Sequence, residues 1–276
     1  MAATRRPVIG FLTDFGLDGA AATCRGVILG ICPDAQIVDI SHTVAKYAIG
    51  DGSFLLRSAL PYLPVGVHVG VVDPGVGTER RPVGISTGRG DVLVGPDNGL
   101  LAEPADALGG IAEVRELTNA ELWLAGTSAT FHGRDIFAPV AAHLAAGDAT
   151  FEAVGAPIDP GDIVRLEAAE AIVNEGSIHA SVIYVDSFGN VRLSARAEAL
   201  ERAFGAIVPG ARLVANVAEH DPLIVAFAPS FGHVAIDAAL LYRDSSGNLA
   251  LALNRGDLAG RLGIGRGASV RLSRPD

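Results

Sequence analysis

One acidic residue stands where an apolar run ends and two arginines follow it closely. The β-branched run at residues 65–72 stops at Asp73, and a Pro-Gly pair comes directly after it. This order is typical of a buried strand that opens into a tight loop. Arg80 and Arg81 close the loop, so either guanidinium could return positive charge to the Asp73 carboxylate. The loop is therefore a candidate site, although a surface turn with a solvated Asp would contain the same residues.

Three further polar residues of the first half, Asp14, Asn98 and His132, stand at the ends of strands or turns. Parallel strands present their carboxyl ends at one edge of a sheet, so these residues and Asp73 are expected to converge there. Such a cluster would position water for general-base chemistry, or it would hold a divalent metal ion. Turn formation and a hydrogen-bonded buried histidine explain the same residues without any site.

Strands alternate with helices in the first half of the chain, which predicts βαβ units and a mostly parallel sheet. The expected strands are 8–13, 36–40, 65–72, 83–86, 91–94 and 111–116. The expected helices are 19–31, 48–60, 100–108 and 136–146. A linker is expected at 157–160, where prolines cluster.

Short strands and turns dominate from residue 177 onward, and one helix is expected at 196–204. The expected strands are 177–185, 191–193, 212–217, 223–228, 233–242, 249–253 and 269–272. This pattern favours a small antiparallel barrel or sandwich. The predicted fold class is α/β: an N-terminal, mostly parallel α/β sandwich domain (1–165), followed by a smaller C-terminal antiparallel β-barrel-like domain (166–276).

Composition and charge exclude several classes of function. The net charge of −10 argues against a nucleic-acid-binding groove. No apolar run approaches the roughly 18 residues of a membrane helix, and the basic start of the chain precedes too short an apolar stretch for a secretory signal. Cys24 and Cys32 are the only cysteines, and we expect both to be reduced in a cytoplasmic protein. No Gly-x-Gly-x-x-Gly opens a helix after the first strand, so a nicotinamide oxidoreductase is disfavoured.

Six stretches, taken together, resemble one family, the S-adenosyl-L-methionine hydroxide adenosyltransferases, which are related to the fluorinase and the chlorinase. The stretches follow the family order over nearly the whole chain, and six in order are specific although each alone is weak. They are residues 12–16 (Leu-Thr-Asp-Phe-Gly), 73–81 (Asp-Pro-Gly-Val-Gly-Thr-Glu-Arg-Arg), 96–100 (Pro-Asp-Asn-Gly-Leu), 131–135 (Phe-His-Gly-Arg-Asp), 186–190 (Asp-Ser-Phe-Gly-Asn) and 253–256 (Leu-Asn-Arg-Gly).

The resemblance implies a reaction in which water attacks the ribose 5′ carbon of S-adenosyl-L-methionine and yields adenosine and L-methionine. The family's water-activating residues correspond to Asp73, Arg80 and His132. The halogenating relatives lack these three residues, and the fluorinase carries a long insertion where this chain has only the turn 87–90. The resemblance implies no cofactor and no metal.

Binding roles follow from the resemblance position by position. Asp14 corresponds to the carboxylate that holds the ribose hydroxyls, and Asp18 and Asp186 to residues near the methionine ammonium. Ser245 corresponds to a contact with the methionine carboxylate, while Ser246 departs from the arginine of the halogenases. The remaining expected substrate-binding residues are Tyr47, Phe131, Gly133, Phe188, Asn190, Phe231, Leu253, Asn254 and Arg255. The family forms trimers in which the ligand lies between the first domain of one subunit and the second domain of its neighbour, so a homotrimer is implied.

Two other functions account for parts of the same pattern. Asp14, Asp73, Asn98 and His132 would suit a metal-dependent hydrolase of a small nucleotide-like substrate. A non-catalytic protein that binds adenosine or S-adenosyl-L-methionine would need only the binding residues. For the 186–190 stretch taken alone, a plain hairpin turn is the better interpretation.

Overall fold

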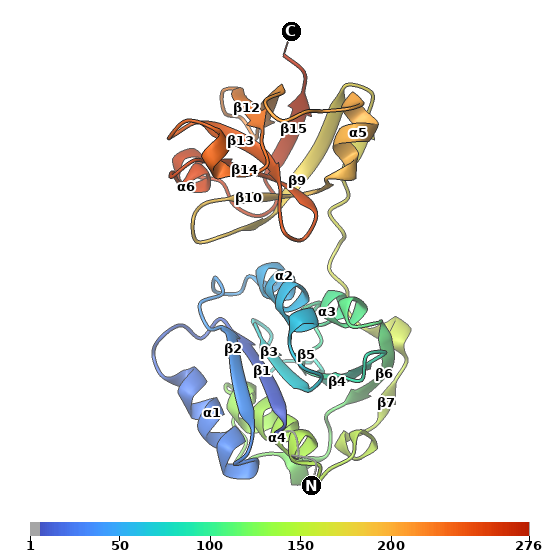
Figure 1. Ribbon diagram of the computed structural model, residues 1–276. Coiled ribbons are helices and arrows are strands. Elements are labelled where there is room, and N and C mark those ends of the chain that lie inside the picture. Colours follow the sequence, from blue (N-terminus) through green and yellow to red (C-terminus); the bar gives the residue numbers. More distant parts are fainter. Residues whose placement is uncertain (1–5, 276) are drawn as a thin grey trace, which may run out of the picture. The chain divides into compact units, whose positions relative to one another are not determined.

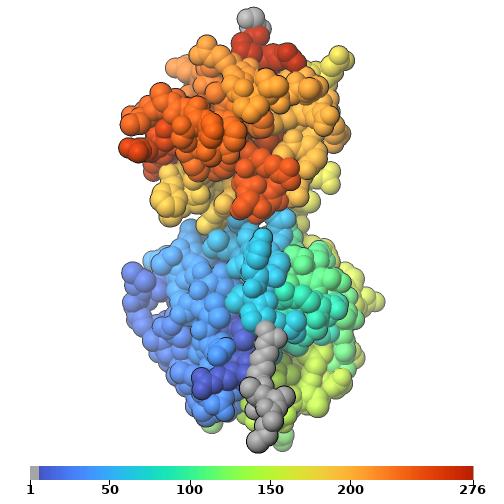
Figure 2. All heavy atoms as spheres, viewed as in Figure 1, coloured from blue at the N-terminus to red at the C-terminus, as the bar shows by residue number. Residues whose placement is uncertain are grey.

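The chain divides into two units between Leu166 and Glu167 in the computed structural model, which describes residues 6–275. Each unit is one continuous stretch of chain, blue to yellow-green in the first and yellow to red in the second (Figures 1 and 2). The basic start of the sequence, residues 1–5, lies outside the described residues. No helix in residues 6–275 is long and apolar enough to cross a membrane.

The first unit contains a seven-stranded sheet with the strand order β2-β1-β3-β5-β4-β6-β7. Its strands are β1 (Val8–Thr13), β2 (Gln36–Ser41), β3 (Val67–Val71), β4 (Pro82–Thr87), β5 (Val92–Pro96), β6 (Ile111–Glu116) and β7 (Pro157–Ile158). Its α-helices are α1 (Ala20–Ile31), α2 (Ile49–Ala59), α3 (Ala102–Ala107) and α4 (Ala138–Ala146). Strands β2, β1, β3 and β5 pair in parallel, and β4 runs antiparallel to both of its neighbours.

Helices cover both faces of this sheet, which makes the unit a three-layer α/β sandwich (Figure 1). Helices α1 and α4 pack with Ile9 and Phe11 on one face, whereas α2 and α3 pack with Leu12 on the other. All six residues of β1 are buried. A parallel strand buried on both faces needs a continuous apolar run, so the sequence shows no alternation there. The predicted fold class of the first domain is confirmed.

Register brings the ends of β1 and β3 to one point of the sheet edge. Thr13 pairs with Val71, so Asp14 and the Val72–Asp73 step both follow directly at that edge. The Asp14 N–H donates to the Val71 carbonyl at 3.3 Å. The two acidic loops are thereby fixed side by side by main-chain pairing alone.

The second unit is a closed barrel of seven strands in the order β10-β14-β13-β12-β11-β15-β9, which the β9–β10 pairing closes, with β8 added beside β9. Its strands are β8 (Ile172–Asn174), β9 (Ser177–Val185), β10 (Val191–Arg196), β11 (Arg212–Val217), β12 (Leu223–Phe227), β13 (Ala239–Arg243), β14 (Asn248–Leu253) and β15 (Ser269–Ser273). Its helices are α5 (Glu198–Phe204) and α6 (Leu258–Leu262). All pairs are antiparallel except β12–β13, so the predicted barrel is confirmed.

Two local predictions were wrong, and one helix was missed. The expected linker at 157–160 contains β7, which pairs with β6 as an edge strand. The expected strand 233–242 begins only at Ala239, because Asp237 has a φ of 60° and the chain turns there. Helix α6 was not expected, since its five residues form less than two turns and include a glycine.

Candidate active site

Arg80 joins Asp73 and His132 in one hydrogen-bonded group. Its Nε donates to Asp73 Oδ1 at 3.1 Å and its Nη2 donates to Asp73 Oδ2 at 2.5 Å. The same Nη2 lies 3.2 Å from Nδ1 of His132. Only 6% of the Arg80 side chain and 5% of the Asp73 side chain are exposed, so solvent screens this ion pair little.

Two loops and a π-helical turn hold the group together. Asp73 follows β3, and the loop 73–81 packs against the segment that leads to His132. A Cβ on Gly77, whose φ is +76°, would lie 2.4 Å from the Ala129 carbonyl oxygen, so only glycine permits this approach. The π-helical turn η3 (Gly133–Phe137) begins directly after His132 and places the Phe137 ring 5.4 Å from the Arg80 guanidinium carbon.

His132 is held as a neutral imidazole with a defined tautomer. A guanidinium has only donors, so Nδ1 of His132 accepts from Arg80 and the ring proton lies on Nε2. Burial lowers the pKa of His132 below its ordinary value of 6.5, and the charge of Arg80 lowers it further, against a smaller opposite effect of Asp73. The ring therefore presents an N–H donor at Nε2 at neutral pH.

Two residues that the sequence placed near this group have other partners. Arg81 turns away from Asp73 and binds Asp97 with Nε at 3.1 Å and Nη2 at 2.6 Å, and it also donates to the Asp162 carbonyl. The Asn98 amide donates to the Val72 carbonyl at 2.9 Å and thus fixes the end of β3. Among the described residues no group of three or more His, Cys, Asp or Glu side chains has the arrangement of a metal site.

A cavity of about 100 Å³ opens beside the group in the first unit. Asp14 lines it, and its Oδ2 accepts from the Tyr47 N–H at 2.9 Å. The expected residues that line it are Asp14, Tyr47, Asp73, Phe131, His132 and Gly133, joined by Phe15, Val71, Val76 and Thr130. Asp18 is exposed in the loop before α1 and does not line the cavity.

The second unit has its own cavity of about 570 Å³, which contains most of the other expected binding residues. They are Phe188, Asn190, Phe231, Leu253, Asn254 and Arg255, together with Gly256 and Asp257. Phe188 is 75% exposed, so its ring face is free for a ligand within the described unit. Ser245 lies in the exposed turn after β13 and does not line this cavity.

Asp186 holds the turn that carries Phe188 and Asn190. Its Oδ1 accepts from the main-chain N–H groups of both residues at 3.0 Å, and its Oδ2 accepts from the Asn190 amide at 2.9 Å. The carboxylate thus orients the Asn190 side chain through its amide nitrogen and does not occupy its amide oxygen.

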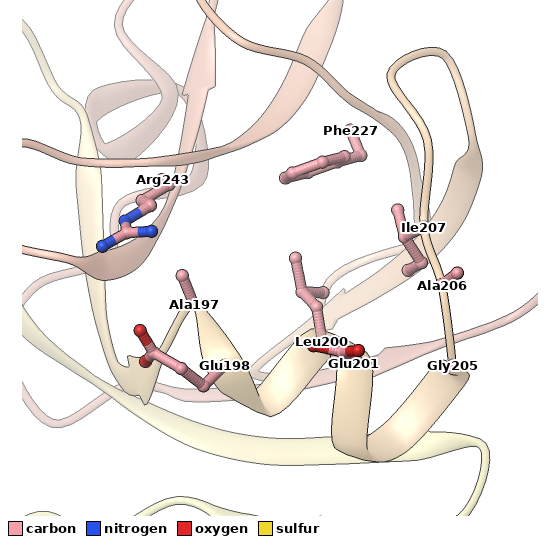
Figure 3. A pocket seen from close by; sticks show the side chains of 9 residues that line it. All are labelled: Ala197, Glu198, Leu200, Glu201, Gly205, Ala206, Ile207, Phe227 and Arg243. Atoms are coloured by element: carbon pink, nitrogen blue, oxygen red, sulfur yellow. The ribbon is translucent and has the colours of Figure 1, made fainter.

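A third cavity, of about 420 Å³, lies beside α5 in the second unit and contains none of the expected residues. Figure 3 shows Leu200, Ile207 and Phe227 around its apolar side, with Glu198 and Arg243 at the other end. It is therefore separate from the cavity that carries Phe188 and Asn190.

Several residues of both cavities escaped the sequence analysis. Phe15, Val76 and Thr130 line the first cavity and Asp257 lines the second. Each of them stands next to, or inside, one of the six stretches named above, so proximity to a motif was the only signal in the sequence. Apolar lining residues carry no chemical signature of their own in a single sequence.

The α/β unit carries an acid, a guanidinium and an imidazole, and the β-barrel that follows it has a cavity lined by aromatic rings. This combination is typical of a two-domain enzyme that acts on a small molecule. Residues 9–155 match the SAM hydroxide adenosyltransferase N-terminal domain, and residues 180–271 match the SAM hydroxide adenosyltransferase C-terminal domain. The chain belongs to the SAM hydroxide adenosyltransferase family.

The alignments with relatives and with a solved structure cover nearly the whole chain. The (R)-S-adenosyl-L-methionine hydrolase of Salinispora tropica is 42% identical over 268 residues, which are 97% of this chain and 98% of that protein. A fluorinase of Actinopolyspora mzabensis is 28% identical in an alignment of 296 residues that covers 98% of this chain and 98% of that protein. The crystal structure of an uncharacterized conserved protein from Thermotoga maritima has a TM-score of 0.88 at 35% identity and covers 96% of this chain and 100% of that one.

Proposed function

We propose that this protein hydrolyses S-adenosyl-L-methionine to adenosine and L-methionine. The observation that carries the proposal is the hydrogen-bonded Asp73–Arg80–His132 group, which lies beside a cavity and whose Asp73 and Arg80 side chains are buried. Family membership and the hydrolases among the relatives support the same substrate.

The proposed step is a displacement at the ribose C5′. The oxygen of a water molecule forms a bond to C5′ while the C5′–S bond breaks. The electron pair of the broken C5′–S bond stays on sulfur. The sulfonium becomes the neutral thioether of methionine, so the leaving group needs no acid. The water loses one proton, and orienting and deprotonating that water is the work left to the protein.

We propose that Asp73 accepts the proton that the water loses. His132 in its Nε2–H form donates a hydrogen bond to the water and orients a lone pair, whereas its Nδ1 is occupied by Arg80. Each Asp73 oxygen has a second lone pair beyond its bond to Arg80. Arg80 Nη1 is buried with no hydrogen-bond partner in the described part of the chain, and a bound water would satisfy it.

The two cavities suit different parts of the substrate. Asp14 is proposed to accept from the ribose hydroxyls, with Tyr47 and Phe131 against the sugar. Phe188 is proposed to stack on the adenine ring and Asn190 to bind its edge. Asp18, Asp186 and Ser245 remain the proposed contacts of the methionine end.

We also propose that the chain works as a homotrimer, in which the two cavities of one site belong to neighbouring subunits. The support is the family resemblance together with the separation of catalytic and aromatic residues into two units. Two free, buried cysteines, Cys24 and Cys32, suit a reducing compartment, and we propose a cytoplasmic location.

A direct assay tests the reaction. Purified protein with (R)-S-adenosyl-L-methionine is expected to release adenosine and L-methionine in equal amounts, measured by chromatography. Exhaustive chelation is expected to leave the rate unchanged, since the proposed step uses no metal. Loss of activity on chelation would favour the metal-dependent hydrolase, and tight binding without product would favour a sensor protein.

The pH profile of kcat/KM is expected to stay flat down to the ordinary histidine range and to fall only below it. Protonation would place an N–H of His132 against the donors of Arg80, and its lowered pKa moves that event to more acidic pH than 6.5. His132→Asn keeps an acceptor near Nδ1 and should lose this acid limb, at a lower rate. An acid limb with the same midpoint in that variant would assign the titration to another group.

A further inference from the structure

We propose that His42 is a positioning residue for Asp14, the carboxylate assigned above to the ribose hydroxyls. The proposal rests on the function proposed above and adds a residue that no motif indicated. His42 follows β2 and lies outside the lining of the cavity, and only 12% of its side chain is exposed. It acts through hydrogen bonds to the loop between β1 and α1.

His42 is the centre of a chain of four side chains. Its Nδ1 lies 2.9 Å from Thr13 Oγ1, and its Nε2 lies 2.9 Å from Asp39 Oδ1. The other oxygen of Asp39 is bound by Arg25. The Phe11 ring packs edge-on against the imidazole with centroids 4.8 Å apart, which limits rotation of the ring.

The donors and acceptors fix the direction of this chain. Thr13 Oγ1 already accepts from the Phe15 N–H at 3.2 Å, so its own proton is free to go to Nδ1 of His42. The ring proton then lies on Nε2 and is donated to Asp39, whose carboxylate only accepts. Arg25 in turn holds Asp39, so every polar group of the chain has a partner.

The residues held by His42 surround Asp14 on both sides. The His42 carbonyl accepts from the Gly16 N–H at 2.7 Å, while Thr13 accepts from Phe15. The segment after His42 delivers the Tyr47 N–H to Asp14 Oδ2 at 2.9 Å. Both the main chain and one carboxylate oxygen of Asp14 therefore depend on the position of this segment, which leaves Oδ1 for a ligand.

A hydroxyl, an imidazole and a carboxylate in a row also form the arrangement of a nucleophilic triad. Thr13 is fully buried, with 0% of its surface exposed, so its oxygen cannot reach a substrate. The row therefore transmits position and not nucleophilic attack.

The test is a double-mutant cycle between His42→Leu and Asp14→Asn, read as kcat/KM for S-adenosyl-L-methionine and as Kd for adenosine. His42→Leu is expected to lower kcat/KM about tenfold, because, of its two lost hydrogen bonds, only the one to Thr13 leads to the Asp14 loop, and Asp14→Asn is expected to lower it more strongly. The double variant should match Asp14→Asn alone, because His42 acts through that carboxylate. Multiplying losses would overturn the proposal.

Two conservative variants separate positioning from simple stability. His42→Asn keeps an acceptor for Thr13 and should recover most of the lost rate. Asp39→Asn should behave like His42→Leu, because Arg25 takes the amide oxygen and the amide N–H then faces Nε2, which reverses the tautomer. If the rate instead followed the melting temperature across all variants, the role of His42 would be purely structural. His143→Asn is the matched control, because His143 on α4 is likewise paired with a carboxylate, that of Asp148.

The outcome is separable from that of the proposed function. A wild-type protein without turnover removes the hydrolase assignment, and the adenosine Kd values still decide whether His42 and Asp14 are coupled. A wild-type protein that neither turns over S-adenosyl-L-methionine nor binds adenosine overturns both.

Discussion

Arg80→Lys is expected to lower kcat at least about a hundredfold, because a compact ammonium cannot replace a bidentate fork that also bridges to an imidazole. Arg80 uses Nε and Nη2 on Asp73, and the same Nη2 reaches His132. Lysine keeps the positive charge, so a loss of kcat of this size would report on the geometry of the Arg80 hydrogen bonds. Adenosine release at saturating substrate gives kcat, and calorimetric titration should show that adenosine still binds.

Arg80→Ala is expected to lose most turnover as well, with a cost in stability. It leaves Asp73 as a buried carboxylate without its cation, and breaking a buried pair costs about 3–5 kcal/mol. Arg115→Lys is the matched control, since Arg115 is also paired with a carboxylate, Glu113, but lies on β6. Full turnover in either Arg80 variant would remove this residue from the chemistry.

Co-expression of two inactive variants is expected to restore about a quarter of the wild-type rate, if sites form between neighbouring subunits of a ring. One variant is Arg80→Ala in the first unit. The other is Phe188→Ala combined with Asn190→Ala in the second, which should cost about a hundredfold through lost stacking and one lost hydrogen bond. A site is intact only when its first unit comes from the Phe188→Ala, Asn190→Ala chain and its second unit from the Arg80→Ala chain. In an even random mixture each condition holds for about half of the sites, which gives about a quarter.

Separately purified variants mixed without subunit exchange form the control, and they should stay inactive. Co-expressed chains that show no more than the mean of the two single variants would exclude a site shared between subunits. Light scattering on the same samples reports the oligomeric state directly.

The first domain and the candidate loop 73–81 were predictable because their signals are local. A continuous apolar run predicted β3, and the residue that ends it, Asp73, necessarily lies at the sheet edge. The neighbour pairing of β1 with β3 then brings Asp14 beside it. The position of Asp73 at the sheet edge needs only periodicity and the parallel arrangement of strands, whereas the pairing of β1 with β3 was not predicted.

Side-chain partners were not predictable, because they depend on packing across the fold. From the residue pattern alone two adjacent arginines were equivalent, and only the family resemblance singled out Arg80; in the structure Arg80 turns to Asp73 and Arg81 turns to Asp97. Asn98 resembled a ligand-binding amide, although its donor goes to the Val72 carbonyl. His42 carried no signal, since Thr13 reaches its ring only when β1 pairs with β2, and Asp39, three residues earlier, resembles any polar neighbour.

The Arg81–Asp97 pair has a bearing on where the first unit can be cut from the rest. Asp97 Oδ1 accepts from the Val164 N–H at 2.9 Å, and Arg81 holds the Asp162 carbonyl at 2.7 Å, so the tail 157–166 is part of that unit. A fragment that stops at residue 155, where the matched N-terminal domain ends, would lack β7 and leave Arg81 with half of its partners. An expression fragment for the isolated α/β unit should therefore extend through Leu166, because Arg80, the neighbour of Arg81 in the chain, holds Asp73 and His132.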